Sequence, residues 1–173
     1  MTARLHSYAF TAQTTVAARH QVRTTLTGRV VRGEGVAYRL RVGHRRTEVV
    51  RTRRATYVRK LPGQWARLAH PRAVTNPTAT LLALLRGMTA VEVRGGPAGS
   101  KQVRGRIDPP TARAAGIPAD GRPAEVAVTL DRHAHVTAVV VRTGTQAGRH
   151  AVTAVVHTSY RGFDHVSAIH PPV

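Results

Sequence analysis

Alternation of apolar and polar residues runs through most of this chain and constrains its fold more than any other feature. The clearest case is "GVAYRLRVG", where Val36, Tyr38 and Leu40 alternate with Arg39. A period of two places alternate side chains on opposite faces of a β-strand. We therefore expect strands at residues 7–16, 21–30, 35–43, 45–52, 55–60, 88–94, 101–107, 124–131, 135–143 and 150–160.

The connections between these segments are short and rich in turn-forming residues, as in "RGEG", "VGHRR" and "TGTQAG". Short connections favour antiparallel neighbours, because parallel pairs need long crossovers. The pattern predicts a large antiparallel meander with one apolar face and one arginine-rich face. No fixed-period repeat or linker divides the chain, so we expect a single domain over residues 1–173.

Two helices are expected to interrupt the strands. In "NPTATLLALLRG", Asn76 suits the cap, Pro77 the first helical position and Gly87 the left-handed closing position. The leucines of this segment cover more than half of its circumference, so the helix should be buried on more than one side. A second, shorter helix is expected in "PPTARAAG". A sheet whose apolar face is covered by a leucine-rich helix can leave an apolar cavity between the layers.

Charge sets the second constraint. The chain has 27 Lys and Arg against 8 Asp and Glu, a formal net charge of +19. Such a field favours polyanions or an anionic membrane surface, although a solvated basic face explains it equally. Without cysteine the chain can form no disulfide, zinc-thiolate site or cysteine nucleophile. No apolar run is long enough to span a membrane as a helix, and the first residues contain no signal-peptide core.

Motifs that carry chemistry are weak. "GGPAGSK" lacks the order of a phosphate-binding loop and is interpreted as a hairpin loop. His133 and His135 lack a third metal ligand at matching spacing, and Asp131 is expected to start a tight turn. The acids are scattered, and no nucleophile elbow is present. The sequence therefore predicts no enzyme, no metal and no cofactor.

Specific nucleic-acid binding is also not expected. A sheet that reads single strands usually places aromatic side chains among its basic residues. Only 4% of this chain is aromatic, and Tyr8, Phe10 and Tyr38 fall on the apolar parity, away from the arginines.

Landmarks in chain order resemble the mycobacterial LppX/LprG-type lipoproteins, within the LolA/LolB-like lipoprotein-carrier superfamily. They are "SYAFTAQ", "TYVRKLPGQWARL", "NPTATLLALLRGMTAVEVRG", "VRGRID", "AEVAVTLDRHAHVTAVVVR" and "SYRGFDHVSAIHPP". The resemblance implies an α+β fold in which a strongly curved antiparallel half-barrel encloses a few short helices and an apolar cavity. It also implies lipid or glycolipid carriage in the cell envelope, without catalysis. Members carry a signal peptide and a lipidated cysteine, which this sequence does not contain. We expect that they have been removed, with an untethered relative as the alternative.

Our leading hypothesis is a non-enzymatic, extracytoplasmic protein that binds acyl chains between the sheet and the leucine-rich helix. The candidate lining residues are Tyr8, Phe10, Tyr38, Leu40, Tyr57, Trp65, Leu81, Leu85, Leu130 and Val140. Arg59 and Arg67 are candidates to meet an anionic headgroup. Two alternatives stay open: an envelope sensor that binds a protein partner and has a filled pocket, and a basic module that binds polyanions. Plain core packing explains each lining residue equally.

Overall fold

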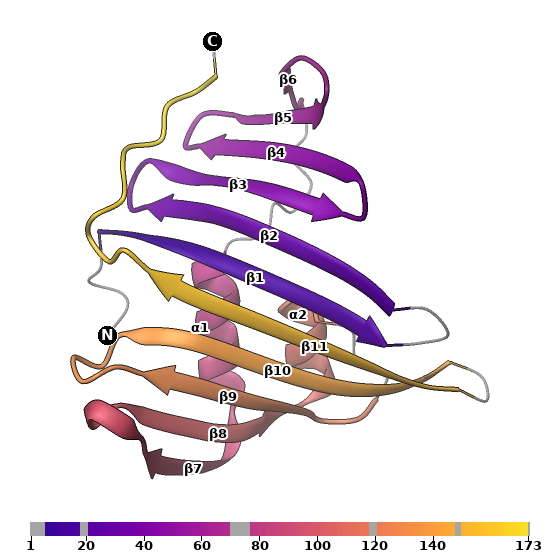
Figure 1. The fold of residues 1–173 in the computed structure, drawn as a ribbon, viewed down its shortest axis with the longest axis vertical. Coiled ribbons are helices and arrows are strands. Elements are labelled where there is room, and N and C mark those ends of the chain that lie inside the picture. The colour runs from indigo at the N-terminus through magenta and orange to yellow at the C-terminus, as the bar shows by residue number, and fades with distance from the viewer. Residues whose placement is uncertain (1–5, 18–20, 70–76, 118–120, 148–149, 173) are drawn as a thin grey trace.

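The computed structural model describes residues 6–17, 21–69, 77–117, 121–147 and 150–172. Most of this part of the chain is strand, and the helices are short (Figure 1). The strands are β1 (Ser7–Ala17), β2 (Gln21–Val31), β3 (Gly35–Val42), β4 (Arg45–Thr52), β5 (Thr56–Leu61), β6 (Ala66–Arg67), β7 (Thr89–Gly95), β8 (Lys101–Ile107), β9 (Ala124–Leu130), β10 (Val136–Ala147) and β11 (His150–Arg161). The helices are α1 (Pro77–Gly87) and α2 (Pro109–Ala114), with a 3-10 turn at Pro97–Gly99.

All eleven strands of the described residues form one antiparallel sheet, in the order β6-β5-β4-β3-β2-β1-β11-β10-β9-β8-β7. Each half of the sheet is a meander of chain neighbours. The halves meet where β1 pairs with β11, and Phe10 lies opposite Tyr160 at this junction. The first and last strands of the chain therefore lie together in the middle of the sheet, and the segment that contains α1 leads from one edge to the other (Figure 1).

Both helices lie on the same face of the sheet, which we call the inner face (Figure 1). Leu81 and Leu84 of α1 are buried in one apolar cluster with Phe10, Val128 and Val141 of the sheet. The opposite, outer face carries no helix among the described residues and presents many of the arginines. The expected α+β class, with one large antiparallel sheet, one apolar face and few short helices, is confirmed; its curvature into a half-barrel stays a prediction.

Phe10 is the largest of the fully buried side chains among the described residues, with 1% of its surface exposed. Its ring lies over Gly28 of β2, where an added Cβ would be 2.9 Å from the Phe10 Cζ and 2.5 Å from the Ala37 carbonyl oxygen. Glycine is therefore required at this position by the close approach of the ring and the next strand. The two residues fix the packing at the middle of the sheet.

Turn chemistry agrees with the sequence. The carboxylate of Asp131 accepts backbone N–H bonds from His133 and His135 at 2.9 and 2.8 Å, which confirms the tight turn. The "GGPAGSK" segment connects β7 to β8 as a hairpin loop, as expected. α1 begins at Pro77 as expected, whereas the proposed cap Asn76 lies outside the described residues. Within the described ranges, no helix has the length and apolar content to cross a membrane.

The segment after β11 runs back along the ends of the N-terminal strands (Figure 1). The Asp164 carboxylate accepts the backbone N–H groups of His6 and Ser7 at 2.6 and 3.2 Å. Further along, the Ile169 N–H donates to the Glu34 carboxylate at 2.7 Å, and Ile169 is buried. These contacts attach the C-terminal segment to the N-terminal half of the sheet.

Candidate binding site

The inner face contains an apolar cavity of about 190 Å³ between the sheet and the helices. Its sheet side is formed by Phe10, Ala12, Leu26, Leu40 and their neighbours on β10 and β11. Its helix side is formed by one face of α1 and by the residues that follow α2. Threonines are the main polar residues along the wall, so the cavity suits an uncharged, apolar group.

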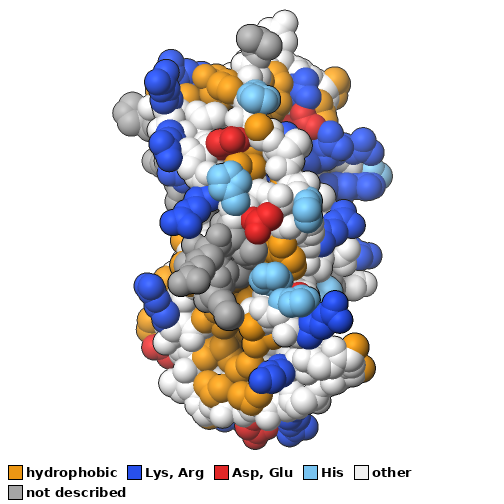
Figure 2. Space-filling view, turned by 90° about the vertical axis from the view of Figure 1, so that its left-hand side faces the viewer, with side chains coloured by type: hydrophobic (Ala, Val, Ile, Leu, Met, Phe, Trp, Pro, Cys, Tyr) orange, Lys and Arg blue, Asp and Glu red, His pale blue; other side chains and the backbone are white. Residues whose placement is uncertain are grey.

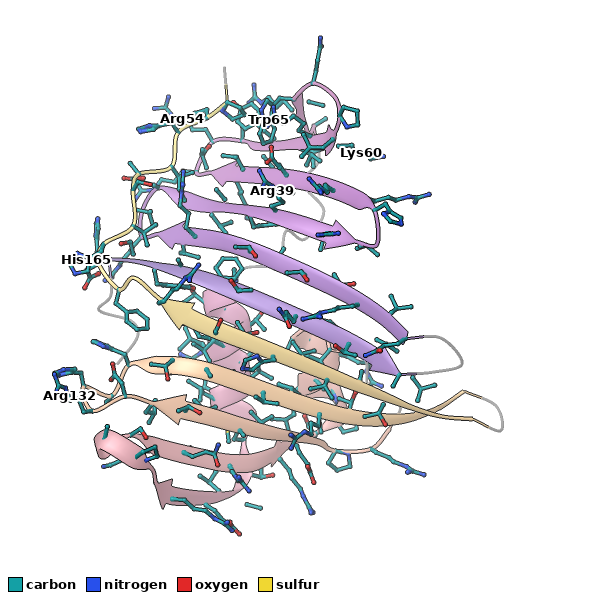
Figure 3. The ribbon with its side chains drawn as sticks, viewed as in Figure 1. Arg39, Arg54, Lys60, Trp65, Arg132 and His165 are labelled. Carbon is teal, nitrogen blue, oxygen red and sulfur yellow. The ribbon has the colours of Figure 1, made fainter. Side chains whose placement is uncertain are left out.

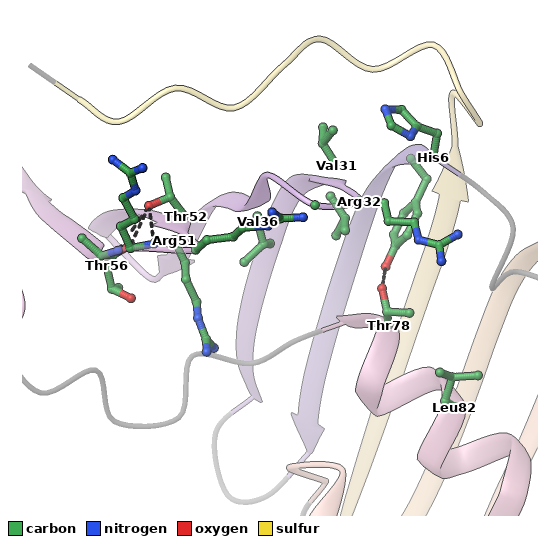
Figure 4. Close-up of a pocket in the computed structure, with 16 residues that line it drawn as sticks. His6, Val31, Arg32, Val36, Arg51, Thr52, Thr56, Thr78 and Leu82 are labelled. Atoms are coloured by element: carbon green, nitrogen blue, oxygen red, sulfur yellow. Dashed lines mark hydrogen bonds between the residues drawn. The ribbon is translucent and has the colours of Figure 1, made fainter.

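A second hollow, a cleft of about 610 Å³, opens at the end of the same face (Figure 4). A row of residues that pair across neighbouring strands runs along one side of it. This row consists of Tyr8, Val30, Val36, Arg51 and Thr56. The β2–β3 and β4–β5 turns form its rim, and Thr78 and Leu82 of α1 form the opposite side (Figure 4).

Arginines are concentrated at this cleft. Arg51 comes from the inner face of β4, Arg32 from the β2–β3 turn, and Arg53 and Arg54 from the β4–β5 turn. Figure 2 shows this end of the molecule, where Lys and Arg side chains gather along both sides of the view. The cleft therefore combines a basic rim with an apolar side.

Tyr8 separates the cleft from the cavity. Its hydroxyl is 2.5 Å from the Thr78 Oγ1, so sheet and helix are joined at this point. Its ring packs edge-on against Phe10 and Tyr160, with centroid distances of 6.4 and 5.7 Å. Burial raises the pKa of Tyr8, although the hydrogen bond with Thr78 opposes this effect. The hydroxyl is therefore neutral at physiological pH.

Two further tyrosines of the inner face are also neutral. Burial raises the pKa of Tyr160, and nearby Tyr8 adds to the effect. Burial raises the pKa of Tyr38 as well, while the positive charge of Arg51 partly offsets the rise. Among the described residues, the site thus offers neutral hydroxyl groups on the sheet and positively charged side chains at its end.

Trp65 lies on the outer face, in a groove of about 830 Å³ bounded by the C-terminal segment (Figure 3). The guanidinium carbon of Arg59 is 4.8 Å from the centre of the Trp65 ring. Such cation–π contacts contribute about 0.5–1 kcal/mol at exposed sites. The expectation that Trp65 lines the cavity beneath α1 is therefore wrong.

Glu48 organises this outer groove. Its carboxylate binds the guanidinium groups of Arg59 and Arg39 on the neighbouring strands. These hydrogen bonds, first from Arg59 and then from Arg39, hold the pKa of Glu48 below its ordinary value. The Glu48 side chain is only 13% exposed, so the ion pairs are partly shielded from water. Arg59 is in this way held over the tryptophan.

The depressed pKa predicts a pH-dependent effect of Glu48→Gln. A group whose pKa is lower in the folded state stabilises the fold above its unfolded pKa and loses this effect as pH falls through the folded value. We expect the variant to be less stable than the wild type at pH 7, with a difference that shrinks toward pH 3. Urea unfolding at pH 7, 5 and 3 measures this difference.

Glu92→Gln is the matched control, because the Glu92 side chain is 63% exposed and forms its ion pair, at 3.1 Å, with the equally exposed Arg94. Exposed pairs contribute little to stability. A Glu48→Gln difference that stays constant from pH 7 to pH 3 would contradict the role assigned to this carboxylate.

The structure brings together only part of the predicted lining set. Phe10 and Leu40 line the cavity, and Tyr8 lines the cleft. Four more predicted residues belong to the inner-face core or pack against it: Leu81, Leu85, Leu130 and Tyr38. A role of all seven in binding a ligand stays a prediction.

Tyr57 and Val140 are on the other side of the sheet. Tyr57 pairs with Val50, and Val140 with His157 and Ala127, in the rows that face outward. Val139 and Val141, on either side of Val140, are the inward neighbours, with 3% and 1% exposure. The expectation that Tyr57 and Val140 line the same cavity as Phe10 is wrong for this reason.

The predicted headgroup arginines are also elsewhere. Arg59 covers Trp65 on the outer face, and Arg67 pairs with Tyr57 at the sheet edge. Neither is among the described residues that line the cavity or the cleft. Sequence reasoning missed the arginines of the cleft. The signal was present in two turn segments, "VRGEG" and "RTRRAT", whose proximity becomes visible only once β3 pairs with β4.

His133 and His135 lie near each other, with ring centroids 6.1 Å apart. Among the described residues, however, no three His, Asp or Glu side chains come together as a metal site would require. The structure assigns these histidines to the Asp131 turn, where His135 Nδ1 is 3.3 Å from the second carboxylate oxygen.

No family model and no curated protein matches the sequence. Solved structures give distant matches, one of which is the crystal structure of MucB in complex with MucA(peri). That alignment has 12% identity, covers 96% of this chain and 94% of that chain, and has a TM-score of 0.19. Backbones that superpose so poorly carry no argument about fold or function.

Proposed function

We propose that this chain binds the acyl chain of a lipid or glycolipid in the cavity of the inner face, as a carrier or presenter in the cell envelope and not as an enzyme. The observation that carries the proposal is the apolar cavity of about 190 Å³ lined by Phe10, Leu40, Leu84 and other inner-face residues. We propose in addition that the chain is related to the LppX/LprG-type lipoproteins, that its sheet is curved into a half-barrel, and that it acts outside the cytoplasm.

The size of the cavity limits what it holds without rearrangement. An apolar cavity of about 150 Å³ is known to take up benzene. A cavity of about 190 Å³ therefore suits a short acyl segment of about six carbons. Six buried methylenes contribute about 5 kcal/mol at about 0.8 kcal/mol each. Association alone costs about 4–15 kcal/mol, so tight binding needs further contacts or a wider cavity.

Mass spectrometry of the native protein, after gentle purification and lipid extraction, tests the proposal. We expect a lipid to accompany the folded chain and to be replaced when the chain is mixed with vesicles of a different lipid. If no lipid accompanies the chain and vesicles transfer none, the proposal fails. The cavity is then a packing defect of the core, and a protein-binding role for the same fold becomes the better hypothesis.

A further inference from the structure

We propose that the arginine-lined cleft is an anion site that binds the phosphate headgroup of an amphiphile whose acyl chain enters the neighbouring cavity. This inference rests on the proposed function and adds the chemical class of the ligand. It also places the headgroup at residues that the sequence did not single out, at the end of the inner face.

Strand pairing and two facing turns bring the arginines to the cleft. Arg51 faces inward from β4 because it pairs with Val36 and Thr56 in the inner-face row. The β4–β5 turn adds Arg53, whose guanidinium lies over Gly33 of the facing turn. An added Cβ at Gly33 would be 2.9 Å from Arg53 Nη2, and Gly33 has a left-handed φ of +84°. The glycine turn thus leaves room for the arginine.

The charged side chains that line the cleft are positive. No Asp or Glu is among the described residues that line the cleft. Glu34, in the β2–β3 turn, accepts the N–H of Ile169 in the C-terminal segment. Glu48 faces the other side of the sheet, where it binds Arg39 and Arg59. The four cleft arginines therefore produce a local positive potential, and none of the described residues that line the cleft contributes a carboxylate.

The arginines of the cleft favour a phosphate group as the bound anion. An arginine presents paired N–H donors that match phosphate oxygens, and a phosphate group offers several acceptors at once. Several arginines that line one cleft from two turns and one strand suit such a group better than a single carboxylate. The cleft volume of about 610 Å³ is within the usual range of about 300–1,000 Å³ for ligand pockets.

The anion site adjoins apolar residues that can contact the tail of an amphiphile. Val30, Val36 and Leu82 line the cleft beside the arginines, so part of its wall suits hydrocarbon. Tyr8 of the cleft and Phe10 of the cavity are alternate residues of one strand, which places them about 7 Å apart. An acyl chain that joins a headgroup at the arginines to the cavity would have to displace the Tyr8–Thr78 contact, which lies between the two hollows.

Binding of two single-chain lipids of equal chain length tests this inference. Lysophosphatidate carries the phosphate, and monoacylglycerol lacks it; both are titrated below their micelle concentrations at about 0.1 M salt against a fluorescent fatty acid bound to the full chain. We expect the wild type to bind lysophosphatidate at least tenfold more tightly. Inorganic phosphate and a DNA duplex are titrated as separate competitors.

The variant Arg53→Gln/Arg54→Gln removes two exposed cleft arginines, and Arg51→Gln removes the one on the strand. The control Arg45→Gln/Arg46→Gln removes the same charge as the first variant from exposed positions at the opposite ends of the strands. We expect the cleft variants to lose the tenfold preference and the control to keep it. Circular dichroism melting checks that each variant is folded.

The outcomes separate the two proposals. If both lipids bind equally and the cleft variants change nothing, the headgroup inference is overturned while the proposed function stands. If neither lipid binds the wild type, the proposed function fails. Inorganic phosphate that binds as tightly as lysophosphatidate would make free phosphate the ligand and overturn the amphiphile. If DNA competes with lysophosphatidate equally well in the cleft variant and in the control, binding reflects the general positive charge of the chain. That result would also overturn the inference.

Discussion

Phe10→Ala is expected to lower the free energy of unfolding by about 3–5 kcal/mol, because truncating a buried phenylalanine removes its burial energy and leaves a cavity. The side chain is 1% exposed and packs on Gly28, Tyr8 and the core cluster. Its strand, β1, is also the one that joins the two halves of the sheet through β11. A loss of this size is a large part of a typical domain stability of about 5–15 kcal/mol.

Urea unfolding followed by circular dichroism measures the effect, with the slope compared between variants to confirm that both unfold in the same way. Thr11→Ala is the matched control, since Thr11 is the next residue of β1 and faces outward opposite Ser159 and Thr27. We expect the control to change stability by no more than about 0.5 kcal/mol. Equal losses in the two variants would show that the inner face does not hold the core of this protein.

Local pattern was sufficient to predict both α-helices and every described strand except the two-residue edge strand β6. Alternation predicted these strands with boundaries that are identical to those observed, as for 45–52 against Arg45–Thr52, or differ by a few residues, as for 135–143 against Val136–Ala147. Pro77 and Gly87 are the first and last residues of α1, as expected, but Gly87 does not adopt the left-handed φ that was expected of it. Short turns predicted the antiparallel neighbours. These features depend on residues close together in the chain, so a single sequence contains the information.

The face on which a side chain lies could not be predicted in two situations. In one, consecutive residues of a strand are all apolar; in the other, the polar residue points inward and its apolar neighbour points outward. Val139, Val140 and Val141 are consecutive valines, so alternation does not show which of them points inward. At Tyr57 the usual order is reversed, because the neighbouring Thr56 is buried at 2% exposure and the tyrosine faces outward. In such segments the register with neighbouring strands decides the face.

The positions of Trp65 and of the cleft arginines depend on longer-range geometry. Trp65 follows the turn at Pro62, where the alternation has ended, and its ring contacts Arg59 on the outer face. The cleft forms only when the row from Tyr8 to Thr56 is assembled from five strands and brought against α1. No spacing along the chain encodes that arrangement, so the candidate site was only partly predictable.

Ala12→Leu tests the proposed acyl site and is expected to have a large effect on acyl binding, because the leucine should fill the cavity without disturbing the sheet. Ala12 lines the cavity directly between Leu26 and Thr158 of the neighbouring strands. A leucine there occupies space that is empty in the wild type. Cavity-filling changes of this kind commonly raise stability by about 0.5–2 kcal/mol. Acyl binding should weaken at least tenfold, about 1.4 kcal/mol, because the same volume is no longer free.

Uptake of a fluorescent long-chain fatty acid and transfer from lipid vesicles measure this loss, together with a melting curve for each variant. Ala138→Leu is the control, since Ala138 lies on the outer face of β10 opposite Ser159 and Thr129 and should leave uptake unchanged. Loss of uptake in Ala12→Leu alone, with its melting temperature equal or higher, supports the cavity as the acyl site. A folded Ala12→Leu protein that takes up the fatty acid as the wild type does would show that the acyl chain does not enter this cavity.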